Sequence, residues 1–150
     1  MNERKKILIA EDSGRVFNML MVELDPTIWN VLRVRAVDEA IGAVNTSGPF
    51  DCFVIDLQIL ATGLTLDEMD KYQDLEGYAF LKEHLWKGKT DEEVKALRSR
   101  TIICSKYVEN FKKKYRNEIE GLIIINKEKK DKKEQGFEKK VASLVKEICL

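Results

Sequence analysis

The stretch KKILIAEDSG, residues 5–14, places two adjacent carboxylates directly after a short apolar run. Ile7 to Ala10 form a run typical of a buried strand, and Glu11 and Asp12 follow it without a spacer. Neighbouring carboxylates repel each other and raise each other's pKa, so such a pair needs either a cation between the groups or open water around them. The rest of the chain has to indicate which applies.

Short apolar runs alternate along the chain with segments of helical period, and this alternation is typical of an α/β fold with a parallel sheet. Five runs predict strands at 6–10, 29–36, 50–56, 101–105 and 121–126. Amphipathic helices are expected at 16–24, 38–44, 75–86, 108–116 and 137–148. At 150 residues the chain has the length of one domain with a substantial core.

The charge balance excludes an electrostatic reason to expect nucleic acid or an anionic membrane as a partner, because 26 basic residues face 26 acidic ones. The halves nevertheless differ. Residues 1–100 carry 13 basic and 18 acidic residues, net −5, and residues 101–150 carry 13 and 8, net +5. We expect this asymmetry to mark two faces of the molecule.

The three cysteines, Cys52, Cys104 and Cys149, are odd in number and lack the spacing of metal ligands. They suit buried thiols in a reducing compartment rather than a disulfide framework. The N-terminus lacks a signal-peptide core, and no apolar run approaches the roughly 20 residues that span a bilayer. We therefore expect a cytoplasmic protein without membrane contact.

Polar residues interrupt the apolar runs where the predicted strands end. The first strand ends in Glu11 and Asp12, the third in Asp56 and the fourth in Ser105, while Lys127 follows the fifth. Ligands of open parallel sheets bind at the carboxyl ends of the strands, so these groups should converge. Three carboxylates, a hydroxyl and an ammonium suit a divalent cation and a phosphoryl group, and oxygen ligands favour Mg²⁺.

This pattern resembles the receiver domain of two-component response regulators over nearly the whole chain. The spacings carry the resemblance, with 44 residues from Asp12 to Asp56 and 22 from Ser105 to Lys127, and LEGYAFLK (75–82) looks like the start of the family's third helix. The resemblance implies a single flavodoxin-like domain with a doubly wound sheet of five parallel strands. The 49 residues from Asp56 to Ser105 exceed the usual spacing. We therefore expect insertions at about 60–73 and 88–99.

Both proposed insertions contain a predicted capping box, which favours a short helix. The sequence TLDE (65–68) places Thr65 and Glu68 at the start of the first, and TDEE (90–93) places Thr90 and Glu93 at the start of the second. We expect the segment 61–73 to be partly helical, with only a small apolar face.

Transferred residue by residue, the resemblance implies that Asp56 accepts the phosphoryl group, that Ser105 is the switch hydroxyl and that Lys127 pairs with the phosphate. It implies Mg²⁺ as cofactor, held by a ligand set of Glu11, Asp12, Asp56 and Gln58. It further implies self-catalysed phosphoryl transfer and dephosphorylation, with a histidine kinase or phosphotransfer protein as partner. Each of these residues can also have a purely structural role. Glu11 and Asp12 can cap the first helix, and Asp56, Ser105 and Lys127 can be ordinary loop residues.

Four positions depart from the family pattern. Lys106 replaces a small residue after the switch hydroxyl, Ile124 replaces an aromatic on the fifth strand, Glu128 replaces the proline after Lys127, and Leu60 stands where proline is frequent. A cis bond at Lys127–Glu128 would cost about 2.5–4 kcal/mol relative to trans, so that loop should be built differently.

Three functions remain open at this point. The first is a stand-alone response regulator that signals through a downstream protein or self-association, using the face of the fourth helix, fifth strand and fifth helix. The second is a pseudo-receiver, a phosphorylation-independent interaction module, which Lys106 and Ile124 favour. The third, a flavodoxin-like binder of small molecules, ranks last because no glycine-rich phosphate loop follows the first strand.

Overall fold

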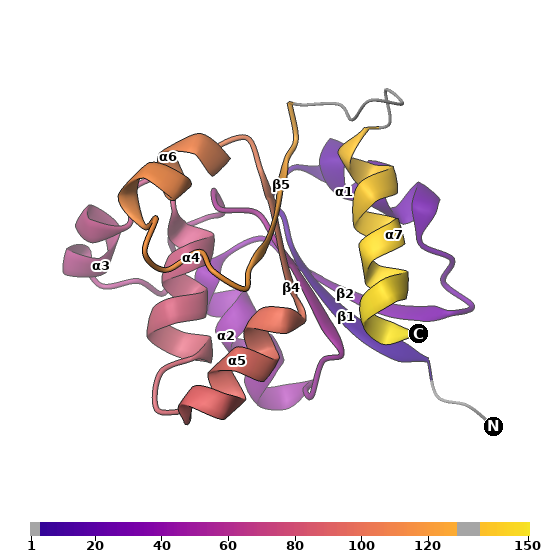
Figure 1. The fold of residues 1–150 in the computed structure, drawn as a ribbon, viewed down its shortest axis with the longest axis horizontal. Coiled ribbons are helices and arrows are strands. Elements are labelled where there is room, and N and C mark those ends of the chain that lie inside the picture. The colour runs from indigo at the N-terminus through magenta and orange to yellow at the C-terminus, as the bar shows by residue number, and fades with distance from the viewer. Residues whose placement is uncertain (1–3, 129–135) are drawn as a thin grey trace.

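A computed structural model describes residues 4–128 and 136–150 and contains one sheet of five parallel strands in the order β2-β1-β3-β4-β5 (Figure 1). This confirms the expected flavodoxin-like α/β fold. The strands are β1 (Lys5–Ala10), β2 (Trp29–Val34), β3 (Cys52–Ile55), β4 (Thr101–Ser105) and β5 (Ile123–Asn126). Three of them are shorter than expected. At β5 the reason is a turn, in which Leu122 N–H donates to the Ile119 carbonyl and Gly121 has a positive φ of 82°.

Helices cover both faces of the sheet (Figure 1). One face carries α1 (Gly14–Glu23) and α7 (Phe137–Cys149). The other carries α2 (Val37–Thr46), α4 (Glu76–Phe80), a π-helical turn η1 (Leu81–Leu85) that continues α4, α5 (Asp91–Ser99) and α6 (Val108–Lys114). A short helix, α3 (Leu66–Lys71), lies at the outer end of that layer. Among the described residues no helix is long and apolar enough to cross a membrane.

Burial on both faces explains why the strands are continuously apolar. Successive side chains of a strand point to opposite faces. In β1, Leu8 and Ala10 therefore join the core under α2 and α4, whereas Ile7 and Ile9 join the core under α1 and α7. The alternating pattern of helices and buried strands thus produces two cores, one on each side of the sheet.

Backbone pairing continues one residue past the strands and fixes the two residues that follow them. Glu11 N–H donates to the Val34 carbonyl at 2.9 Å, and Asp56 N–H donates to the Ala10 carbonyl at 2.9 Å. Because β1 lies between β2 and β3, both residues are held at the carboxyl edge where the strand order reverses. This is the edge at which open α/β sheets bind ligands.

Both predicted capping boxes are present. Thr65 and Glu68 exchange bonds of 2.9 and 3.1 Å at the start of α3, and Thr90 and Glu93 exchange bonds of 3.1 Å each at the start of α5. The helices α3 and α5 lie within the ranges 60–73 and 88–99. Each box satisfies first-turn donors that the helix itself cannot pair.

The segment after α3 reaches deeper into the core than its sequence suggests. Tyr72 is fully buried, its ring stacks on Tyr115 with 6.2 Å between centroids, and it meets Tyr78 edge-on at 6.3 Å. Its hydroxyl donates to Glu83 at 2.6 Å. Leu66, by contrast, is 83% exposed. The segment is therefore held by one aromatic anchor at its end and not by the face of α3.

Gly77, near the start of α4, allows that helix to approach β3 closely. A Cβ at this position would lie 2.0 Å from the Asp56 carbonyl oxygen and 2.9 Å from Ile55 Cγ2. The Gly77 N–H donates to the Leu57 carbonyl at 2.8 Å. Contacts this short with backbone cannot be relieved by a side-chain rotation, so α4 and the residue after β3 fit only around a glycine.

We predict that Tyr72→Ala lowers the free energy of unfolding by about 3–5 kcal/mol, because it empties a large aromatic site and leaves Tyr78 and Tyr115 without their partner. Leu66→Ala, its control on the exposed face of α3, should change stability by less than about 0.5 kcal/mol. Urea unfolding measures both. Equal losses of unfolding free energy in the two variants would mean that the segment is not anchored through Tyr72.

We predict that Gly77→Ala destabilises the protein by at least about 1–3 kcal/mol through overpacking against Asp56. Gly42→Ala is the matched control, because Gly42 lies in α2 with nothing within 4 Å of a new Cβ. That change should stabilise by about 0.5–1 kcal/mol. Thermal unfolding of the two variants should shift in opposite directions, and a harmless Gly77→Ala would contradict the close packing.

Candidate functional site

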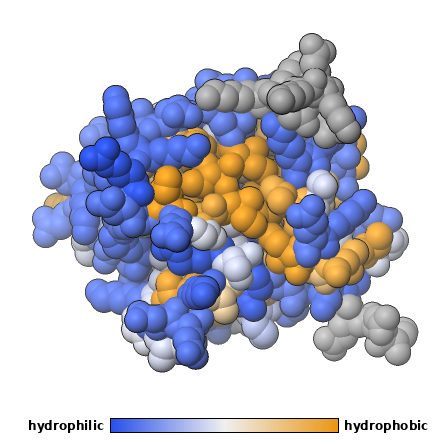
Figure 2. Space-filling model, viewed as in Figure 1, coloured by the Kyte–Doolittle hydropathy of each residue, from blue (hydrophilic) through white to orange (hydrophobic). Residues whose placement is uncertain are grey.

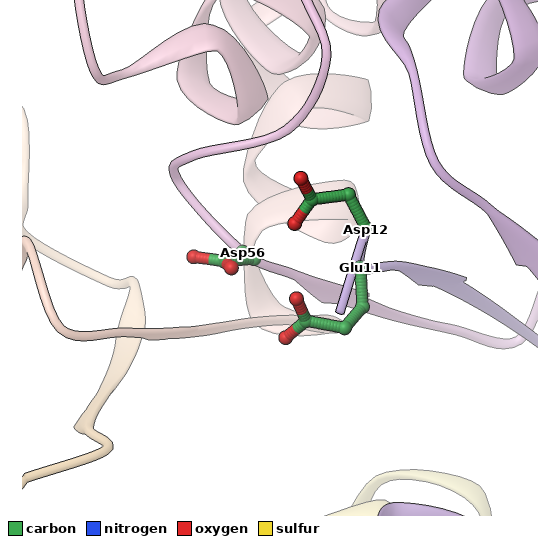
Figure 3. A group of neighbouring side chains, drawn as sticks. All are labelled: Glu11, Asp12 and Asp56. Carbon is green, nitrogen blue, oxygen red and sulfur yellow. The ribbon is translucent and has the colours of Figure 1, made fainter. Parts of the chain in front are cut away.

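Three carboxylates meet at the carboxyl edge of the sheet. Glu11, Asp12 and Asp56 each offer an oxygen, and these oxygens all lie within 4.8 Å of one another (Figure 3). Glu11 and Asp12 follow β1 and Asp56 follows β3, as the sequence predicts. Glu11 is 2% exposed and Asp56 is 8% exposed, whereas Asp12 is exposed.

The ammonium group of Lys127 lies between the two buried carboxylates. Its Nζ donates to Glu11 Oε1 at 2.5 Å and to Asp56 Oδ2 at 2.9 Å. The Lys127 N–H donates to the Ser105 carbonyl at 3.1 Å, which ties the residue to the end of β4. The acidic pair after β1 therefore has a cation beside it, supplied by the residue after β5.

The four charges do not balance. Three carboxylates and one ammonium give −3 + 1 = −2 when all are ionised. Burial and, to a lesser extent, the charge of Asp56 together raise the pKa of Glu11 to about 7, against the opposing effect of Lys127. Burial also disfavours the charged form of Lys127, but the charges of Asp56 and Glu11 outweigh it and raise its pKa. Hard carboxylate oxygens with surplus negative charge fit a divalent cation such as Mg²⁺.

The loop after β1 has its own supports. Ser13, and not Glu11 or Asp12, is the N-cap of α1, because its Oγ accepts from Val16 N–H at 3.2 Å. Arg33 on β2 donates from Nε to the Glu11 carbonyl at 3.1 Å and from a terminal nitrogen to the Asp12 carbonyl at 3.2 Å. The alternative that the acidic pair caps α1 is therefore wrong. The Glu11 carboxylate instead accepts from the Ser13 N–H at 3.2 Å and from Lys127.

The residues after β3 continue the same loop. Asp56 Oδ1 accepts from the Gln58 N–H at 3.2 Å, which leaves Asp56 with a contact on each oxygen. The side-chain amide of Gln58 donates to Asp74 at 3.2 Å. Gln58 thus lies at the site, with its amide nitrogen turned toward Asp74.

A hollow of about 910 Å³ contains these groups. It is lined by Glu11, Asp12, Asp56, Gln58, Lys106 and Lys127, and it extends between α1 and α7 past Arg15 and Phe137. Lys106, the first departure from the family pattern, therefore lies at the site, with its Nζ 5.5 Å from the centre of the Tyr107 ring. Ser105 is fully buried outside the lining, and its Oγ accepts from Tyr107 N–H at 3.2 Å.

The loop after β5 is built without a cis bond at Lys127–Glu128, as expected. Within the described residues the cis peptide bond is Gly48–Pro49. Asn126 instead turns the chain, because its Oδ1 accepts from Glu128 N–H at 2.9 Å. A side-chain turn of this kind replaces the proline in directing Lys127 back to the sheet.

Two supports of the site were not foreseen from the sequence. Arg33 stands among apolar residues of a strand, and that interruption could have singled it out. Gly77 touches the backbone of Asp56, and its only sequence signal is a glycine near the start of a helix. Neither contact follows from periodicity, because both depend on how distant elements meet.

No family model matches the chain, and no curated protein sequence matches it either. Solved structures, in contrast, are similar to the chain. A sensor protein from Polaromonas sp. JS666 superposes with a TM-score of 0.65 at 15% identity, covering 98% of this chain and 97% of that one.

Two response regulators also superpose on nearly the whole chain at low sequence identity. The Mn(2+)-bound form of response regulator Rcp1 gives a TM-score of 0.63 at 14% identity, with coverage of 93% and 92%. The receiver domain of the Francisella response regulator 1452 gives 0.56 at 19% identity, with coverage of 96% and 98%. At these identities the likeness concerns the fold, and the chain has the receiver fold of response regulators.

Proposed function

We propose that this chain is a single-domain response regulator that accepts a phosphoryl group on Asp56 from a histidine kinase or phosphotransfer protein. The observation that carries the proposal is the arrangement around Asp56, where Lys127 reaches its carboxylate at 2.9 Å and two further carboxylates lie within 4.8 Å. The receiver fold, with this cluster at its ligand-binding edge, supports the same assignment.

The chemistry requires charge neutralisation before a carboxylate can attack a phosphorus dianion. An oxygen of Asp56 forms the new bond to phosphorus, while the bond from phosphorus to the donor's histidine nitrogen breaks and the nitrogen keeps the electron pair. Lys127 is placed to pair with a phosphoryl oxygen. Glu11, Asp12, Asp56 and Gln58 would hold Mg²⁺, which supplies charge neutralisation when bound, and Rcp1, with the same fold, was solved with Mn²⁺.

Ser105 gives the site a means of signalling transfer. Its hydroxyl is engaged with Tyr107 N–H. If it turns to a phosphoryl oxygen, this bond breaks and the loop between β4 and α6 follows. A local charge change would thereby alter the surface built by α6 and β5.

That surface, the α6–β5–α7 face, suits a protein partner or a second copy of the chain. Figure 2 shows apolar surface between α6 and α7, over β5, where Leu122, Ile123 and Ile124 are partly buried. The basic part of the chain, residues 101–150, contributes Lys112, Lys113 and Lys114 at the end of α6. Four further lysines of this part lie outside the described residues: Lys129, Lys130, Lys132 and Lys133. An apolar centre favours protein docking over nucleic acid, which would require stacking aromatics or a denser basic surface.

The pseudo-receiver keeps one specific observation in its favour. Lys106 lines the hollow beside the carboxylates, so its ammonium can occupy the space that an incoming phosphoryl group needs. In that function the chain binds its partner without phosphorylation.

We predict that acetyl phosphate with Mg²⁺ adds one phosphoryl group, and that Asp56→Asn abolishes the addition. Asp12→Asn should raise the Mg²⁺ concentration required, because it removes a ligand and leaves the acceptor intact. Asp67→Asn on α3 serves as the matched carboxylate control and should label normally. Intact-mass measurement over a range of Mg²⁺ concentrations reads out all four proteins. An unchanged mass for the wild type would favour the pseudo-receiver.

We predict that beryllofluoride with Mg²⁺, a phosphoryl mimic, strengthens association through the α6–β5–α7 face. Sedimentation velocity should show a larger species with the mimic, and the double reversal Lys112→Glu, Lys113→Glu should change that response while Asp67→Asn leaves it unchanged. A DNA mobility shift at physiological salt without any change in protein association would overturn the docking assignment, since DNA binding follows phosphate neutralisation by lysines.

A further inference from the structure

A pair of thiols lies at the opposite end of the sheet from the acidic site. Cys52 is the first residue of β3 and Cys149 is the last residue of α7. They are 97 residues apart in the chain, yet α7 packs against β3, which brings both residues to the same end and the same face of the sheet. Both are free cysteines that belong to the core shared by β3 and α7.

The two thiols differ in exposure. Cys52 is fully buried, and Cys149 is only partly buried near the end of the chain. An oxidant in solution can therefore reach Cys149, while Cys52 lies deeper in the same core. An accessible thiol with a second, buried thiol near it is the arrangement in which an oxidised cysteine is resolved as a disulfide.

The surroundings favour thiolate on the accessible member. Interaction with the neighbouring Cys52 thiol lowers the pKa of Cys149, and the charges of Lys5 and Arg100 lower it further, against burial and the charge of Asp51. The same interaction, followed by burial, raises the pKa of Cys52. Cys149 is therefore the more readily ionised of the two, and a thiolate is the nucleophilic form of cysteine.

The third cysteine provides an internal comparison. Cys104 in β4 is 2% exposed, and burial raises the pKa of its thiol to about 12. The pKa of Cys149 lies below the ordinary value of a thiol, so Cys104 carries the smaller fraction of thiolate. Greater intrinsic nucleophilicity of the more basic thiolate offsets part of this difference, but the burial of Cys104 also limits access to it.

We propose that Cys52 and Cys149 form an oxidation site at which hydrogen peroxide converts two thiols into one disulfide. The Cys149 thiolate attacks a peroxide oxygen, the O–O bond breaks, and the leaving hydroxide takes a proton to form water. Cys149 is then a sulfenic acid. The Cys52 sulfur, giving up its proton, attacks the Cys149 sulfur, the S–O bond breaks, and a second water leaves. Each disulfide therefore consumes one peroxide, which is reduced by two electrons.

The disulfide would join two elements that both extend to the acidic site. The strand β3 runs from Cys52 to the residue before Asp56, and α7 runs from Phe137, which lines the hollow, to Cys149. Oxidation would fix the far ends of these elements to each other. The proposal stands independently of phosphorylation, because none of its steps uses Asp56.

The test treats the reduced full-length chain with hydrogen peroxide and follows intact mass and thiol alkylation after denaturation. We expect a loss of two hydrogen atoms per molecule, one remaining alkylatable cysteine, reversal by dithiothreitol, and a peptide map that links Cys52 to Cys149. Cys104→Ser should oxidise at the wild-type rate, and so should Asp56→Asn, which separates this result from the phosphorylation proposal.

Single cysteine variants distinguish the two roles, the attack on peroxide by Cys149 and the formation of the disulfide by Cys52. In Cys52→Ser, oxidation should stop at a sulfenic acid on Cys149, trapped by dimedone, whereas Cys149→Ser should slow peroxide consumption at least about tenfold. The proposal is overturned if the wild type accumulates sulfinic acid on Cys149 without a disulfide, or if Cys104 is oxidised as fast as Cys149. A disulfide between two molecules, seen as a dimer without reductant, would also overturn it.

Discussion

The contact on which the site depends is the placement of one ammonium group against two buried carboxylates. Lys127 reaches Glu11 and Asp56 together, so the loop after β5 is connected to the ends of β1 and β3. Two buried carboxylates whose oxygens lie within 4.8 Å of each other are tolerated because a cation offsets their repulsion. Removal of one partner from such a set leaves an uncompensated buried charge. The same contact leaves a surplus negative charge at the edge of the sheet. A site that neutralises itself only in part retains the capacity to take a divalent cation.

The backbone around this contact is as constrained as the charges. Arg33 holds two carbonyl oxygens of the loop after β1, and Gly77 lets α4 rest on the carbonyl of Asp56. Both groups act on main-chain atoms, so they set where the carboxylates point without taking part in the charge balance. The acidic residues of the site are thus placed by a strand on one side and by a helix on the other.

The sequence predicts the elements and the site residues, but not the contacts that support them. Apolar runs identify all five strands because both faces of the sheet are buried, and the capping boxes at Thr65 and Thr90 are local enough to be recognised. The burial of Tyr72 depends on Tyr115, 43 residues away, and no local pattern reports such a pairing. The π-helical turn after α4 is equally invisible, because its residues fit an ordinary helical period.

The strand order has a consequence for how the chain folds. The outer pairs join residues that are close in sequence: Lys5 and Trp29 are 24 positions apart, and Ile102 and Ile123 are 21 apart. The inner pairs join residues 45 apart, Ile7 and Cys52, and 48 apart, Phe53 and Thr101. Doubling a loop costs only about 0.6 kcal/mol in closure entropy, yet such distant contacts slow the search for the native state. Since β3 is the common partner of both inner pairs, the acidic residues after β1 meet Lys127, which follows β5, only when β3 has joined β1 to β4. The charge cluster is therefore a property of the completed fold.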